Sequence, residues 1–131
     1  SGINFKAMII EEPEAHLHPE LQQKMARLII NMVNLGIPVW ITTHSDTILQ
    51  HINNMMKLKN HERSVELQQE YGYKKTDLLG KEDIQMYQFV TENSRKTRLI
   101  SLEATKYGFV VPTFNDALEK IVDEVYAFQE D

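Results

Sequence analysis

Apolar residues follow two different spacings along the first half of the chain, and the change in spacing separates strands from helices. Residues 5–10, FKAMII, form a short apolar run that ends at two acids, as a strand of a parallel sheet often does. Residues 37–43, IPVWITT, form a second run that is rich in β-branched side chains. Each run precedes a segment with apolar residues at helical spacing, 19–36 and 45–59. The order strand, helix, strand, helix predicts a parallel crossover.

The residues at the ends of the two helical segments suit those positions. Pro19 fits a first helical turn, where a backbone N–H has no partner in the helix, and Gly36 fits a helix stop. Ser45 or Asp46 can cap the second helix with a side-chain oxygen. We therefore expect both helices to begin and end close to these residues.

The second half of the chain is less regular. Residues 60–81 are polar and weakly periodic, which predicts a loop or a mobile insert. Residues 84–90 and 96–102 resemble two strands joined by a polar turn, hence a hairpin, and an apolar face between 114 and 125 predicts a terminal helix. The expected divisions are 1–59 for an α/β core, 60–81 for the loop or insert, and 82–131 for the hairpin and helix.

The hairpin carries both basic and aromatic side chains. Arg95, Lys96 and Arg98 form a small basic group that can contact DNA phosphates or an acidic partner, although a solvated strand edge protected by charge is the favoured interpretation. Tyr87 and Phe89 are expected to pack against the terminal helix rather than stack on bases.

Composition narrows the class of protein. The chain has 131 residues and a net charge of -5, so nothing favours non-specific attraction to nucleic acid. It has no cysteine, which excludes disulfides and thiolate metal sites and favours a cytoplasmic location. No apolar run reaches the roughly 20 residues that cross a bilayer. An abrupt start on Ser1 and Gly2 suggests a piece of a longer protein.

The candidate chemistry lies where the two predicted strands end. Glu11 and Glu12 follow the first run and His44 follows the second, and parallel neighbouring strands bring such ends to one crevice. One carboxylate can hold Mg²⁺ while the other accepts a proton from an attacking water. His44 can donate a hydrogen bond to a phosphoryl oxygen or orient that water.

Residues 8–19, MIIEEPEAHLHP, and the later Thr43-His44-Ser45 resemble the Walker B, D-loop and switch-histidine blocks of ABC-type ATPases, particularly the soluble branch related to RecF, SMC and OLD-type proteins. The resemblance covers roughly residues 5–56. It implies that Glu11 binds Mg²⁺, that Glu12 is the catalytic base and that His44 is the switch histidine. The D-loop positions that it implies are Glu14, Ala15, His16, Leu17 and His18.

The sequence departs from that family at two points. Glu11 stands where most ABC proteins have Asp, and no GxxxxGK[ST] loop or Ser-Gly-Gly signature occurs in the chain. The resemblance therefore implies the C-terminal part of a P-loop NTPase: a partial parallel sheet flanked by helices, then a small α+β tail. The isolated chain is expected to be inactive. The intact parent would bind ATP and Mg²⁺ as a head-to-head homodimer, with DNA or a partner protein as a further partner and no membrane.

The sequence leaves two other functions open, and the last third of the chain shows a further resemblance to a family. The last third is similar to the tail of prophage-type and defence-associated ATPases, but it lacks the Glu-Gly and Asp-x-Asp pattern of a Toprim nuclease. His16 and His18, with the nearby glutamates, offer a transition-metal site and hence a metal-dependent hydrolase. A non-enzymatic interaction module with a degenerate ATPase scaffold is the other alternative.

His51 and His61 are expected to face solvent.

Overall fold

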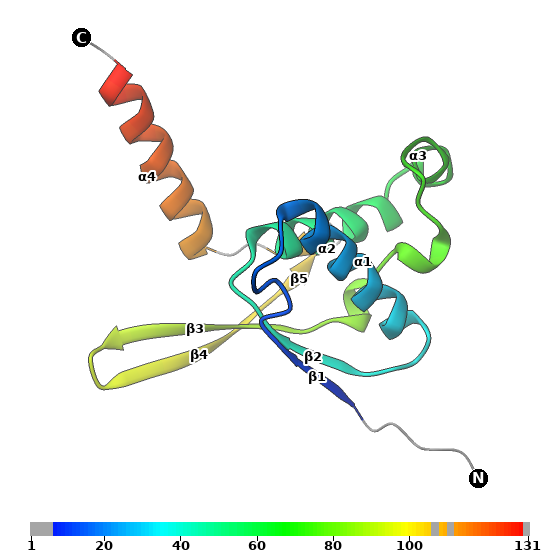
Figure 1. Ribbon diagram of the computed structural model, residues 1–131, viewed down its shortest axis with the longest axis horizontal. Helices are drawn as coiled ribbons and strands as arrows, with labels where there is room; N and C mark the ends of the chain where they lie inside the picture. Colours follow the sequence, from blue (N-terminus) through cyan, green and yellow to red (C-terminus); the bar gives the residue numbers. More distant parts are fainter. Residues whose placement is uncertain (1–6, 106–107, 110–111, 130–131) are drawn as a thin grey trace. The chain divides into compact units, whose positions relative to one another are not determined.

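The computed structural model describes residues 7–105, 108–109 and 112–129, and they form a mixed α/β structure (Figure 1). Residues 1–85 with 104–108 make one compact unit, and residues 86–103 with 109–131 make the other. The elements of the first unit are β1 (Met8–Glu11), α1 (Pro19–Asn34), β2 (Val39–Thr42), α2 (Asp46–Lys59), α3 (Ser64–Tyr71) and the short 3-10 turns Lys75–Asp77 and Lys81–Asp83. The remaining elements are β3 (Met86–Asn93), β4 (Lys96–Leu102), β5 (Ala104–Thr105), β6 (Gly108–Phe109) and α4 (Pro112–Gln129).

β1 and β2 pair in parallel, as the order of elements predicts. The register runs from Met8 opposite Val39 to Glu11 opposite Thr42. Within the described residues this parallel sheet has two strands. The strands are shorter than the apolar runs, because pairing begins only at residues 8 and 39.

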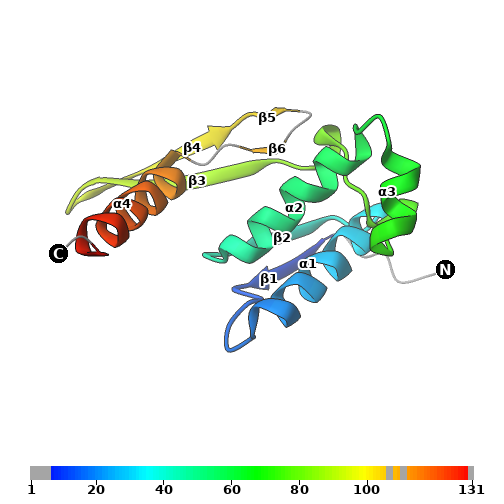
Figure 2. The same cartoon turned by 90° about the horizontal axis from the view of Figure 1, so that it is seen from above.

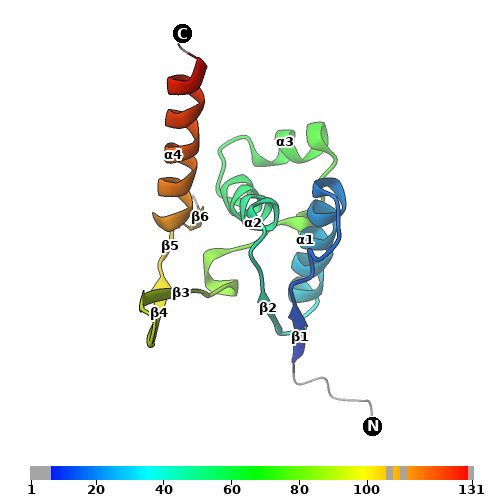
Figure 3. The ribbon, with the colours of Figure 1, turned by 60° about the vertical axis from the view of Figure 1, so that its left-hand side comes forward.

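α1 and α2 pack against each other and lie on one side of the β1–β2 sheet (Figures 1 and 3). Their apolar stripes face each other, because apolar residues at helical spacing line one face of each helix. Ile30 of α1 and Ile48 and Met56 of α2 are the largest fully buried side chains. Figure 2 shows the two helices side by side from above.

The opposite face of the β1–β2 sheet is open. Ile9 and Trp40 are cross-strand partners in the register, and they are 74% and 72% exposed. Parallel sheets normally have both faces covered. The described part of this unit therefore presents an apolar sheet face to solvent.

The helix ends follow the signals in the sequence. α1 begins at Pro19, and Gly36 lies just beyond its end with a φ of 88°, a conformation that glycine adopts without strain. Ser45 is the N-cap of α2, where its side-chain oxygen accepts a hydrogen bond from the N–H of Ile48 at 3.1 Å. Of the two capping residues considered, Ser45 takes the role.

His51 does not face solvent, contrary to the expectation from the sequence. It is 3% exposed, because it lies three residues after Ile48 and four before Met55, on the apolar face of α2. Burial lowers the pKa of His51, and the positive charge of Arg27 adds to this effect while Asp77 opposes it. Burial in the core therefore favours the neutral form of this imidazole.

Residues 60–81 also differ from the predicted loop or mobile insert. They contain helix α3, and the segment that follows buries Asp77, Leu78 and Leu79. The polar composition of residues 60–81 does not reveal that the segment is ordered. The buried carboxylate of Asp77 holds it in place, and the segment has no stripe of apolar residues that would predict this.

Asp77 ties this segment to α1 through three hydrogen bonds and accepts a fourth from within the segment. Arg27 donates from Nε to Oδ1 at 2.9 Å and from a terminal nitrogen to Oδ2 at 2.8 Å. Asn31 donates to Oδ1 at 2.7 Å, and the backbone N–H of Lys74 donates to Oδ2 at 2.7 Å. Burial raises the pKa of Asp77, but these hydrogen bonds outweigh burial and lower it from 3.8 to about 2.

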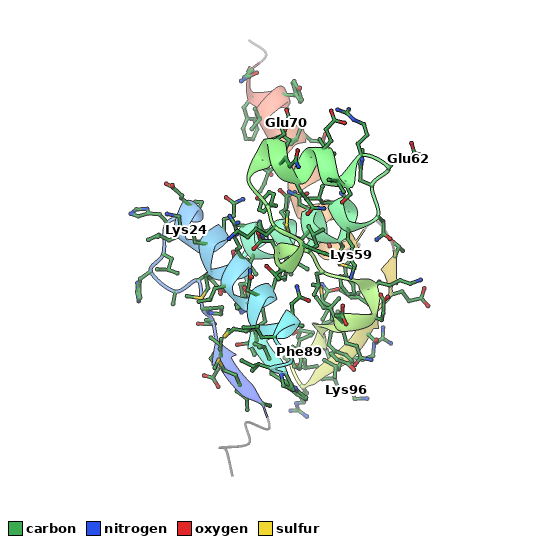
Figure 4. The ribbon with its side chains drawn as sticks, turned by 90° about the vertical axis from the view of Figure 1, so that its right-hand side faces the viewer. Lys24, Lys59, Glu62, Glu70, Phe89 and Lys96 are labelled. Atoms are coloured by element: carbon green, nitrogen blue, oxygen red, sulfur yellow. The ribbon has the colours of Figure 1, made fainter. Side chains whose placement is uncertain are left out.

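The second unit consists of the β3–β4 hairpin and α4. The hairpin forms as expected and is antiparallel. It pairs Phe89 with Leu99, and these side chains are 72% and 53% exposed. The predicted burial of Phe89 is wrong, because alternation places it on the face of β3 opposite the half-buried Met86 and Val90. Figure 4 labels Phe89 on β3 and Lys96 on β4.

Among the described residues, no helix is long and apolar enough to cross a bilayer.

Replacing Asp77 by Asn should destabilise the first unit by roughly 2–4 kcal/mol, because Arg27 and Asn31 lose a buried charged acceptor. The folded pKa lies below the ordinary value, so the charge of Asp77 stabilises the fold above about pH 4, and this stabilisation is lost as the pH falls toward 2. The wild type should lose about 2 kcal/mol over that interval from this residue alone. Urea unfolding at several pH values measures both effects.

The variant Asp83→Asn is the control, since Asp83 is exposed on the same unit. It should leave the free energy of unfolding and its acid dependence close to those of the wild type. Equal stability of Asp77→Asn and Asp83→Asn would contradict the assigned role of Asp77.

Candidate functional site

Parallel pairing brings the loop after β1 beside the loop after β2. The N–H of Glu12 donates to the carbonyl oxygen of Thr42 at 2.8 Å and also approaches its Oγ1 at 3.3 Å. This contact continues the strand ladder by one residue beyond Glu11. The two loops therefore leave the sheet from adjacent points, as the strand-end argument predicts.

The structure brings the side chains of Glu12 and His44 together. Oε1 of Glu12 lies 3.9 Å from Nε2 of His44, and the two side chains are 59% and 90% exposed. A carboxylate and an imidazole at this distance can share a bound water as a hydrogen-bonding partner, and the imidazole can donate to a phosphoryl oxygen. Their exposure leaves both groups accessible to a ligand.

The loop after β1 has an unusual backbone. Glu12 and His16 have φ values of 45° and 61°, in the left-handed region that costs most residues other than glycine roughly 1–2 kcal/mol. Two hydrogen bonds hold this turn, from Ala15 N–H to Glu12 O at 3.0 Å and from Leu17 N–H to Glu14 O at 2.9 Å. Strain of this kind is often found at functional sites.

Glu14, in the predicted D-loop, reaches the second loop directly. Its Oε1 accepts a hydrogen bond from the backbone N–H of His44 at 2.8 Å. Burial raises the pKa of Glu14, but hydrogen bonds from His44, from its own N–H and from the Thr43 side chain outweigh burial and lower the pKa below 4.5. Glu14 is therefore an ionised link between the loops. The sequence placed it in the D-loop without indicating this partner.

Glu11 lies apart from the Glu12–His44 pair. It is the last residue of β1, opposite Thr42, and alternation places it on the open face of the sheet with Ile9. Its side chain is exposed. In the described part of the chain, no hydrogen bond or ion pair joins Glu11 to Glu12 or His44.

The two histidines of the predicted D-loop do not gather with the glutamates. His16 and His18 are exposed, and His18 is the residue that precedes α1, with its carbonyl accepting from the N–H of Gln22 at 2.9 Å. No group of three or more His, Asp or Glu side chains suited to a metal ion occurs within residues 7–105, 108–109 and 112–129. The transition-metal alternative therefore lacks a preformed site there. Ala15 is exposed and Leu17 is half-buried.

Replacing His16 by Gly should raise the free energy of unfolding by up to about 1 kcal/mol, because glycine adopts the left-handed conformation without the clash of a Cβ atom. The matched control is His18→Gly, since His18 has a φ of -68° and no such strain to relieve. Thermal unfolding followed by circular dichroism compares the two. A lower melting temperature for both variants would show that the turn stores no strain at His16.

Residues 4–49 match the family model described as AAA ATPase domain. This match covers 46 of the 131 residues and includes both loops of the site, with Glu11, Glu12, Glu14 and His44. No curated protein and no solved structure matches the chain. The match supports an AAA or P-loop type of ATPase, and with it a nucleotide-dependent function for the region that contains the site.

Proposed function

We propose that the chain is the C-terminal part of an ABC-type ATPase of the soluble branch. In this proposal it supplies the magnesium-binding acid, the catalytic base, the D-loop and the switch histidine of an ATP-hydrolysing head. The GxxxxGK[ST] loop, which is absent from these 131 residues, would belong to a preceding part of the same protein. Two such heads would meet face to face across ATP, with the D-loop at the opposite subunit.

The observation that carries the proposal is the 3.9 Å approach between the Glu12 carboxylate and the His44 imidazole. These residues are 32 positions apart and come from the ends of two parallel strands. Both lie within the segment that matches the ATPase family. A carboxylate and an imidazole that converge on one exposed point fit the outer end of a triphosphate.

Glu12 would accept a proton from the attacking water as the phosphoryl group departs, since its carboxylate is exposed and its backbone is fixed to Thr42. His44 would donate a hydrogen bond to a phosphoryl oxygen and hold the same water in line. The left-handed backbone at Glu12 sets the direction in which its side chain leaves the strand.

In this proposal the acids at the end of β1 would hold the magnesium ion that ATPases use. Mg²⁺ takes oxygen ligands, often through its own bound waters, and Glu11 and Glu12 present two exposed carboxylates at the strand end. Glu11 would hold the ion. When bound, Mg²⁺ neutralises charge on the phosphates and so favours attack by water.

In the complete protein, Glu12→Gln should preserve ATP binding and lower kcat by about a hundredfold or more, because the amide cannot accept the proton. Glu20→Gln is the matched control, as Glu20 is an exposed acid in the first turn of α1. Nucleotide binding by equilibrium titration and phosphate release by a steady-state assay separate the two effects. Undiminished hydrolysis in Glu12→Gln would remove Glu12 from the role of base.

His44→Ala should also slow turnover without unfolding the protein, since the His44 side chain is 90% exposed and contributes little packing. We expect a decrease in kcat of roughly tenfold to a hundredfold, the effect of losing one aligned hydrogen-bond donor. His61→Ala provides the control, because His61 is exposed beyond the far end of α2. A full rate in His44→Ala with normal melting would argue against the switch role.

A further inference from the structure

We infer that Glu14 is a positioning residue for the reaction proposed above: its carboxylate holds the backbone of His44 and so sets where the His44 imidazole meets Glu12. The inference rests on the proposed function for its catalytic meaning. Its structural content, a link between two loops that are 30 residues apart, can be tested without any catalysis.

The first step of the argument concerns how the His44 side chain is held. That side chain is 90% exposed, so packing does not fix it. Its position therefore depends on its backbone, and the backbone N–H of His44 is bound by Oε1 of Glu14 at 2.8 Å. A hydrogen bond to an ionised acceptor is stronger than a neutral one. The hydrogen bond to Glu14 therefore fixes the backbone from which the His44 side chain extends.

The second step is that Glu14 also orders the residues around His44. Thr43 Oγ1 accepts from the N–H of Ser45 at 2.9 Å, and the nearby Thr43 side chain helps to lower the pKa of Glu14. Ser45 in turn caps α2. The hydrogen bond from the His44 N–H therefore holds the carboxylate one residue before the N-cap of a core helix, and a negative charge near such a helix end is favourable.

The third step concerns the other end of the link. Glu14 lies in the turn that begins at Glu12, and the Ala15 N–H bonds to the Glu12 carbonyl at 3.0 Å. One side of the turn is fixed to Thr42 by the N–H of Glu12, and the other is fixed to His44 by the carboxylate of Glu14. These two contacts join the same two loops as the 3.9 Å approach between Glu12 and His44.

Two substitutions separate the reach of the Glu14 side chain from its charge. Glu14→Gln keeps an oxygen acceptor at the same length, whereas Glu14→Asp keeps the charge but is one methylene shorter. If positioning matters, Gln should largely preserve the link and Asp should lose it. Glu70→Ala is the control, because Glu70 is an exposed acid on α3, which follows the other end of α2 (Figure 4).

The first measurement is amide hydrogen exchange on the full 131-residue chain, followed residue by residue by NMR. Exchange at the His44 amide should become about tenfold or more faster in Glu14→Asp and Glu14→Ala, because neither shorter side chain can hold an acceptor at the His44 N–H. Glu14→Gln and Glu70→Ala should stay close to the wild type. Wild-type exchange at His44 in a folded Glu14→Asp variant would overturn the link.

The second measurement is steady-state ATP hydrolysis by the complete protein. Glu14→Asp should lower kcat by about tenfold or more with an unchanged KM for ATP, and Glu14→Gln should restore most of the rate. A protein that Glu12→Gln inactivates but Glu14→Asp does not would overturn the positioning role alone. A wild-type protein without ATP turnover would instead contradict the proposed function, and the exchange data would still decide whether the link exists.

Discussion

Parallel pairing of β1 with β2 is the constraint on which the geometry of the candidate site depends. The ladder begins with the Met8 N–H on the Pro38 carbonyl and ends with the Glu12 N–H on the Thr42 carbonyl. Both loops consequently start at the same level of the sheet, and residues 12 and 44 can meet although they are far apart in sequence. A slip of one residue would turn each side chain of the shifted strand to the other face, so the register and the site are specified together.

The features that could be predicted from the sequence are those that depend on near neighbours. α1 begins at Pro19 and ends before Gly36, and Ser45 caps α2, because the signals for each lie within a turn of the helix end. The order within residues 60–81 depends instead on Arg27 and Asn31, which approach Asp77 from 50 and 46 positions away. A polar segment gives no sign of such a partner. His51 is a different case, because its spacing from Ile48 and Met55 places it on the apolar face of α2, and its polar side chain alone suggested exposure.

The candidate site likewise combines features that the sequence predicts with features that it does not. The strand-end rule predicts that the loops after β1 and β2 lie side by side, and with them Glu12 and His44. The contact of Glu14 with the His44 backbone depends on a turn in which Glu12 and His16 both take left-handed conformations. Glutamate and histidine do not favour this conformation, so the sequence does not predict the turn. Glu11 was expected beside Glu12, yet strand alternation directs it to the open sheet face, while the turn redirects Glu12 toward His44.

The open face of the β1–β2 sheet has a practical consequence. Trp40 is the single tryptophan of the chain, and it lies on that face beside Ile9 with most of its surface in water. Indole emission shifts with the polarity of its surroundings, so the intrinsic fluorescence of this protein reports from one known place. A segment or subunit that covers the sheet would therefore shift the emission of Trp40, and this shift can be measured without an added label.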